Sequence, residues 1–158
     1  MKTPIPAISP GINVAVIRKV NEQWQYLLLQ RSGEDKVYGG LWGLLSGTRD
    51  DNETVTNLAI REMGEETGLR PNTLYASEYC LQFFEPTRDQ VWTLPVLVAV
   101  VDSEAQVALD SENRDFRWLP CQEAAQLAHW RNLKDVIRML EEDLAQFPPP
   151  NWVVMPLP

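Results

Sequence analysis

The chain has 158 residues, of which 44% are hydrophobic and 23% charged, values typical of one globular domain with a buried core. Fourteen Lys and Arg residues against 22 Asp and Glu residues give a net charge of −8, which argues against the broad basic surface of a protein that binds duplex nucleic acid. Small phosphorylated ligands remain compatible with this charge, because a bound metal ion reverses the local field.

Nothing in the composition indicates secretion or a membrane. The start of the chain lacks the apolar run of a signal peptide, and the longest apolar run, residues 96–101, is too short to span a bilayer. The two cysteines, Cys80 and Cys121, are far apart, which favours reduced thiols in a cytoplasmic protein over a disulfide framework. His129 is the only histidine, so we do not expect a histidine-based metal site.

Taken in chain order, the periodicities predict strands, a helix, more strands and a final helical segment. The expected strands are residues 11–20, 24–32, 41–47, 74–85, 91–102 and 116–119, and the expected helices are residues 54–67 and 121–147, the second in one or two pieces. Gly68 fits the end of the first helix, and Pro95 indicates an edge or a bulge in its strand.

This order predicts an α+β fold in which a mixed sheet lies between helices. We expect one domain at residues 11–147, preceded by an irregular arm at residues 1–10 and followed by a proline-rich tail at residues 148–158. The tail cannot continue a helix. It is expected to be a loose or packed arm, or alternatively a strap across a dimer interface.

The segment "REMGEETG", residues 61–68, places Glu62, Glu65 and Glu66 close together on the first expected helix. Like charges at this spacing destabilise a helix. At about 100° per residue, the three carboxylates share one broad sector of the helix surface. An adjacent stripe is apolar and consists of Val55, Ala59 and Met63. The helix can therefore bury one edge and present carboxylates at the other.

Two interpretations of this cluster stay open. A solvated acidic face is the commoner one. The alternative is a divalent-metal site, since clustered carboxylates are natural ligands of Mg²⁺, which also binds substrate phosphates. Arg61 and Glu53 flank the cluster, so a guanidinium group can orient a carboxylate. Backbone carbonyls near Gly47 could supply further oxygen ligands.

Residues 47–69 resemble the Nudix box of the Nudix hydrolase superfamily. Nine residues occupy the constrained positions of that motif over 23 residues: Gly47, Glu53, Arg61, Glu62, Met63, Glu65, Glu66, Gly68 and Leu69. The chain has Leu45, Ser46 and Gly47 where many members of the family carry Pro-Gly-Gly. The resemblance extends less specifically over about residues 11–145 and implies a Nudix-type α/β/α sandwich.

The resemblance implies hydrolysis of a nucleoside diphosphate linked to another group, with Mg²⁺ or Mn²⁺ as cofactor. It implies metal ligands on the carboxylates of Glu62, Glu65 and Glu66 and on the backbone carbonyl of Ser46. It further implies that Glu62 or Glu66 acts as general base, while Arg61 and Glu53 orient the metal-binding groups.

The stretch at residues 111–137 is similar to two Nudix groups, the dATP-type or dihydroneopterin-triphosphate pyrophosphohydrolases and the asymmetric dinucleoside tetraphosphate hydrolases. In both, a glutamate six residues before a tryptophan approaches the metals, which here is Glu112 ahead of Trp118. Glu112 is therefore a candidate metal ligand or base, and a solvated loop carboxylate is the alternative. Glu85 is a weaker candidate for the same role.

For the substrate we expect a pocket wall formed by Phe83, Phe84 and Trp92, with Arg31 as a further contact. The expected reaction converts a nucleoside or deoxynucleoside triphosphate to a monophosphate and pyrophosphate. A dinucleoside polyphosphate or ADP-ribose hydrolase is the enzymatic alternative. The non-enzymatic alternatives are a nucleotide-binding regulator and a structural protein with an acidic helix. Expected partners are a small nucleotide and, at most, a second copy of the chain, as monomer or homodimer.

Overall fold

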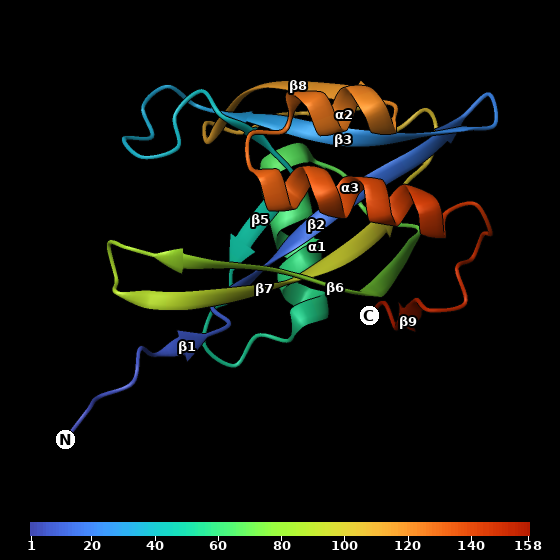
Figure 1. Cartoon of the computed structure of the whole chain (residues 1–158). Coiled ribbons are helices and arrows are strands. Elements are labelled where there is room, and N and C mark those ends of the chain that lie inside the picture. Colours follow the sequence, from blue (N-terminus) through green and yellow to red (C-terminus); the bar gives the residue numbers. More distant parts are fainter.

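The structure, a computed structural model, describes all 158 residues as one nine-stranded sheet with three helices (Figure 1). The strands are β1 (Ala7–Ile8), β2 (Gly11–Val20), β3 (Gln23–Arg31), β4 (Trp42–Gly43), β5 (Leu45–Thr48), β6 (Thr73–Glu85), β7 (Gln90–Val100), β8 (Asn113–Leu119) and β9 (Val153–Met155). The helices are α1 (Val55–Thr67), α2 (Cys121–Leu127) and α3 (Arg131–Asp143).

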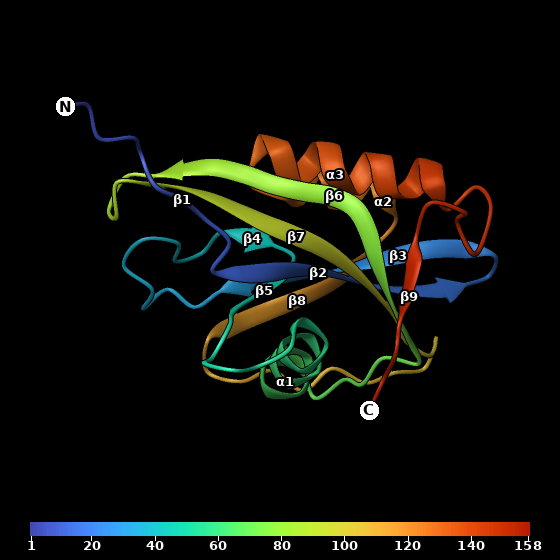
Figure 2. The ribbon, with the colours of Figure 1, turned by 90° about the horizontal axis from the view of Figure 1, so that it is seen from below.

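The sheet is mixed. Its main path runs β4-β3-β2-β7-β6-β9, and β5, β8 and β1 pair with β2, β3 and β7. At its centre β2 and β7 are parallel, with Asn13–Ile17 opposite Val96–Val100, whereas the β2–β3 and β6–β7 pairs are antiparallel. Figure 2 shows α1 on one side of the sheet and α2 and α3 on the other. The expected α/β/α sandwich is therefore confirmed.

Both faces of the central strands are buried, which explains their nearly continuous apolar sequence. Alternate residues of β2 point to opposite faces. Val14 and Val16 join the core beside α1, whereas Ala15 and Ile17 join the core beside α2 and α3. The helix α1 thus packs on the sheet through its apolar stripe. None of the three helices has the length and apolar composition that crossing a membrane requires.

The ends of α1 follow from its flanking residues. Thr54 is the N-cap, and its hydroxyl accepts a hydrogen bond from the backbone N–H of Asn57 at 3.2 Å. Gly68 has φ 70°, a left-handed conformation that ends the helix, and its N–H donates to the carbonyl of Gly64. The predicted end at Gly68 is confirmed.

Pro95 lies at an irregularity of the sheet, as expected. The pairing of β6 with β7 shifts register between Ala76 and Cys80, and Cys80 lies opposite Pro95. Parallel pairing of β7 with β2 begins only at the next residue, Val96. The missing N–H of proline therefore falls outside the central ladder.

The tail is a packed arm, one of the alternatives expected for it, and it contains a strand that was not expected. Strand β9 pairs antiparallel with β6 at Leu74–Ala76. Trp152 is buried, and its Nε1 donates to Oδ2 of Asp143 at 2.9 Å. This strand was not predicted because it is three residues long and lies between prolines. It is stabilised by tertiary packing rather than by a local sequence signal. In the N-terminal arm, β1 likewise pairs with β7.

Other boundaries shift for local reasons. The expected strand 41–47 is divided into β4 and β5, which pair with β3 and β2 respectively. The expected helical segment 121–147 is two helices, and α3 ends at Asp143. Strand β8 begins at Asn113 rather than residue 116, because polar residues at its start pair with β3.

Candidate active site

One cavity, of about 890 Å³, extends from α1 to the β6–β7 hairpin. This size suits a nucleotide. Its lining divides into two kinds of surface. One end is acidic and polar and contains Arg31, Ser46, Gly47, Glu62, Glu66, Glu112 and Asn113. The other is largely aromatic and contains Tyr38, Phe83, Glu85, Trp92 and Trp130. We refer to these as the acidic end and the aromatic end.

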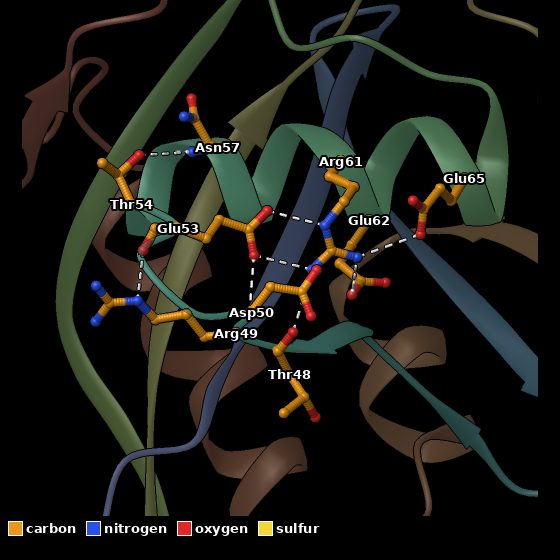
Figure 3. Close-up of polar contacts among 9 residues, drawn as sticks. All are labelled: Thr48, Arg49, Asp50, Glu53, Thr54, Asn57, Arg61, Glu62 and Glu65. Carbon is orange, nitrogen blue, oxygen red and sulfur yellow. Dashed lines mark hydrogen bonds and ion pairs between the residues drawn. The ribbon is translucent and has the colours of Figure 1, made fainter.

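Arg61 lies at the centre of a network of carboxylates beside the acidic end (Figure 3). Its Nε and Nη2 donate to the two oxygens of Glu53 at 2.8 and 2.9 Å, a bidentate pair. Its Nη1 donates to Oε1 of Glu62 at 2.9 Å, and to Oε2 of Glu65 at 3.3 Å. One guanidinium group therefore orients carboxylates from α1 and from the loop before it.

The network keeps its charges in place. The hydrogen bonds from Arg61 lower the pKa of Glu53 to about 2, and they raise the pKa of Arg61 itself. Glu62 also fits closely against Gly47, because a Cβ atom added there would overlap the carboxyl group of Glu62. Glycine at position 47 and arginine at position 61 together define where Glu62 lies.

Glu66 is the most deeply buried carboxylate of the acidic end, with 3% of its surface exposed. Asn113 donates from Nδ2 to Oε2 of Glu66 at 2.7 Å. The other oxygen, Oε1, accepts no hydrogen bond and is not sealed from solvent. Burial raises the pKa of Glu66 to about 7, although the bond from Asn113 and the charge of Arg31 act in the opposite direction. Burial raises the pKa of Glu62 as well.

Arg31 introduces a cation into the acidic end. Its Nη2 donates to Oγ of Ser46 at 3.0 Å, and its Nη1 lies 3.6 Å from Oε2 of Glu112. Ser46 has no positive φ, so its backbone does not require the glycine that many Nudix boxes carry here. The serine hydroxyl instead holds Arg31, which connects β3 to β5.

The structure divides the residues predicted from the sequence as metal ligands. Glu62, Glu66, Ser46 and Glu112 line the cavity. Glu65 does not line it, and its side chain is 58% exposed and bonded to Arg61. No group of three or more acidic, histidine or cysteine side chains is assembled closely enough to hold a metal ion. Carboxylates without a cation between them repel, and here Arg61 and Asn113 satisfy them separately.

At the aromatic end, Phe83 and Trp92 face each other across β6 and β7, with ring centroids 6.0 Å apart. Phe84 is beside them at the rim, but strand alternation turns its side chain to the opposite face and 49% of it is exposed. All the residues expected to contact substrate line the cavity, and Phe84 is the most exposed of the three aromatic side chains.

Sequence reasoning missed Asn113, Tyr38 and Trp130. Asn113 directly follows Glu112, so the motif could have indicated it. Tyr38 and Trp130 are in connecting segments without a motif, and they meet only in space, with ring centroids 5.7 Å apart. Glu85, the weaker metal-ligand candidate, contacts Tyr38 and Thr87 at the aromatic end and neither Glu62 nor Glu66.

The family model for the NUDIX domain matches residues 9–140 of the chain. The chain belongs to the Nudix family. The resemblance stated for residues 47–69 is thereby confirmed, and these residues include the end of β5, the loop after it, α1 and the two residues that follow α1.

Among curated Nudix relatives, the chain is 31% identical over 121 residues to the putative 8-oxo-dGTP diphosphatase 3 of Mycobacterium tuberculosis. That match covers 68% of this chain and 54% of the relative, so the chain spans about half the length of that protein. It is 29% identical over 130 residues to the asymmetrical bis(5'-nucleosyl)-tetraphosphatase of Mus musculus, covering 81% and 86% of the two chains.

Among solved structures, the fold is similar to that of a C. elegans Ap4A hydrolase in a binary complex, with a TM-score of 0.76. The similarity covers 89% of this chain and 100% of the other at 22% identity. At this identity the comparison supports the Nudix fold alone.

Proposed function

We propose that the chain is a metal-dependent Nudix pyrophosphohydrolase that converts a nucleoside or deoxynucleoside triphosphate to the monophosphate and pyrophosphate. One observation carries the proposal. The buried carboxylate of Glu66, with an Oε1 atom that accepts no hydrogen bond, lies in the same cavity as Arg31 and the wall of Phe83 and Trp92. The proposed general base, a cation that can bind phosphate and an aromatic surface for a nucleobase thus belong to one site.

The acidic end fits a hard divalent cation, because its donors are oxygens of the kind that Mg²⁺ and Mn²⁺ prefer. Glu62, Glu66 and the carbonyl of Ser46 would hold the metal, and Glu112, which lines the same cavity, is a further candidate ligand. Glu65 would contribute only after its bond to Arg61 opened. When bound, such a metal supplies charge neutralisation for phosphate oxygens and a lowered pKa for water.

The residues of the chain have distinct tasks in this proposal. Glu66 accepts the proton of the attacking water at Oε1, while Asn113 holds Oε2. Arg31 binds an oxygen of the polyphosphate. Arg61 lines the cavity and Glu53 lies behind it, and the hydrogen bonds of Arg61 to Glu53 and Glu62 position the Glu62 carboxylate.

A dinucleoside polyphosphate hydrolase is the second candidate, and one observation favours it. The aromatic end contains two aromatic pairs, Phe83 with Trp92 and Tyr38 with Trp130, and a dinucleotide offers two bases to stack. The name of the mouse relative agrees with this activity. Hydrolysis of ADP-ribose is a further candidate reaction, and the screen described next includes this substrate.

The test is a screen for released phosphate, pyrophosphate and nucleotide. The wild type would be incubated with Mg²⁺ and with nucleoside triphosphates, dinucleoside tetraphosphates and ADP-ribose. Glu66→Gln should reduce turnover at least about a hundredfold, as loss of a general base does. Glu123→Gln, an exposed carboxylate on α2, is the matched control and should retain turnover.

The outcomes separate the alternatives. Pyrophosphate and a monophosphate from a triphosphate support the main proposal, whereas cleavage of only dinucleoside tetraphosphates supports the second. Nucleotide binding without any turnover, with Mg²⁺ or Mn²⁺, would overturn both and indicate a regulator.

Cytoplasmic location belongs to the same proposal and rests on the two free cysteines. Gel filtration would separate a monomer from a homodimer.

A further inference from the structure

Glu85 is a buried carboxylate of the cavity that the proposed chemistry does not use. It is 6% exposed and lines the aromatic end. Side chains of a strand alternate between faces, so Leu81, Phe83 and Glu85 of β6 form one row along the cavity. The row therefore ends in a charge immediately after an aromatic ring. A buried charge requires hydrogen-bonding partners.

The partners of Glu85 use only part of its capacity. Oε1 accepts from the backbone N–H of Thr87 at 2.9 Å and from the Thr87 hydroxyl, while Oε2 accepts from the Tyr38 hydroxyl at 3.2 Å. These bonds, led by those of Thr87, lower the pKa of Glu85 and keep it ionised. A carboxylate has about four acceptor positions, so one position on Oε2 remains open.

Tyr38 supplies a second hydrogen-bond acceptor beside Glu85. Its single hydroxyl hydrogen is directed to Glu85, which leaves its oxygen able only to accept a hydrogen bond from a ligand. Tyr38 also contacts the edge of Trp130, so its ring is held between β6 and the start of α3. Glu85 and Tyr38 thus present two adjacent acceptors and no donor to whatever lies against Phe83 and Trp92.

We propose that Glu85 and Tyr38 select a guanine-type base by accepting hydrogen bonds from its N1–H and N2–H groups. Guanine is the common base with two adjacent donors on one edge. Adenine and cytosine place a ring acceptor beside their amino group, and uracil places a carbonyl on each side of its single N–H. Acceptors directed at the Glu85 carboxylate would repel it and leave it unpaired. This inference rests on the proposed function only in taking the acidic end as the phosphate site.

The test measures binding of GTP, ITP, ATP and UTP to the full chain, with divalent metal chelated so that turnover does not interfere. ITP differs from GTP only by lacking the N2 amino group. The wild type should bind GTP about tenfold more tightly than ITP, as expected for one lost hydrogen bond to a charged group. ATP and UTP should bind more weakly than GTP.

Glu85→Gln is the informative variant. The two Thr87 donors require the amide oxygen, so the amide N–H₂ replaces Oε2 and presents a donor to the base. The preference for GTP over ITP should then fall to about one, and Tyr38→Phe should also reduce it. Glu78→Gln, an exposed carboxylate on the same strand, is the matched control and should keep the preference.

Other results would overturn the inference. Equal affinity for GTP and ITP in the wild type would do so. So would a Glu85→Gln variant with a lowered melting temperature and an unchanged preference, because that pattern is expected if Glu85 only stabilises the β6–β7 turn through Thr87. The proposed function fails separately. A wild type that prefers GTP in binding but hydrolyses no nucleotide would retain base selection without the enzyme activity.

Discussion

Asn113 at the start of β8 donates a hydrogen bond of 2.7 Å to Glu66 in α1, and both side chains are buried. The two residues are 47 positions apart in the chain. The bond connects the Nudix box to a strand outside it, and it leaves Oε1 of Glu66 open to the cavity. The ionisation of Glu66 therefore depends on a residue that the box motif does not include.

Replacing Asn113 should raise the pKa of Glu66 and lower the stability of the protein. The bond from Asn113 lowers the pKa of Glu66, so Asn113→Ala should raise it above its value of about 7. The variant should also lose about 1–3 kcal/mol of stability, since a buried acceptor loses its partner. NMR titration of the Glu66 carboxylate in chelator would show the shift, and denaturant unfolding would show the loss. An unchanged titration would contradict the assigned role of Asn113.

The metal-free protein should lose stability as pH rises through the titration of Glu66. Its pKa in the folded state, about 7, is above the ordinary 4.5. The folded state therefore favours the protonated form. The stabilisation of the folded state by protonated Glu66, on the order of 3 kcal/mol, is fully present below pH 4.5 and is lost as the pH rises to about 7. Denaturant unfolding in chelator at several pH values would measure it. Glu66→Gln should lack this part of the dependence.

Two glycines of the box should respond in opposite ways to alanine. A Cβ at position 47 would overlap Glu62, so Gly47→Ala should displace that carboxylate and reduce turnover at least about tenfold. Nothing is near a Cβ at position 64, and Gly64→Ala should stabilise α1 by about 0.5–1 kcal/mol. Turnover assays and thermal melts of both variants check this pair. Equal activity of Gly47→Ala and the wild type would count against the placement of Glu62.

Arg61→Lys should not preserve the network, although it preserves the charge. An ammonium group cannot form the bidentate bond to Glu53 while also reaching Glu62. The pKa of Glu53 should rise from about 2 toward its ordinary value, and kcat should fall more than KM changes. NMR titration of the Glu53 carboxylate follows the first effect. Arg70→Lys, at an exposed position after the helix, should change neither quantity.

Mg²⁺ should raise the melting temperature of the wild type, because a cation that binds only the folded state stabilises it. The carboxylates of Glu62 and Glu66 repel the charge of each other and are both buried enough to have a raised pKa. The increase should shrink in Glu66→Gln and remain in Glu123→Gln. A melting temperature that does not respond to saturating Mg²⁺ would argue against a metal site at the acidic end.

The local elements were predictable because their signals are local. The N-cap Thr54, the left-handed Gly68 and the apolar stripe ending at Met63 determine α1 without help from the rest of the chain. The apolar β-branched runs of β2 and β7 likewise indicate strands buried on both faces. Strand β9 was not predictable in this way, since it is three residues long and depends on pairing with β6 and on the burial of Trp152.

By itself, the sequence determined the Nudix box, the α/β/α class and the cluster of carboxylates on α1, because each depends on residue types at fixed short spacings. Only the tertiary structure decided which of them share a cavity. It placed Glu66 with Asn113 and Arg31, turned Glu65 to solvent, and brought Tyr38 to Glu85. The physical reason is that strand order and register unite residues far apart in the chain, and burial and hydrogen bonding then determine the charge each one carries.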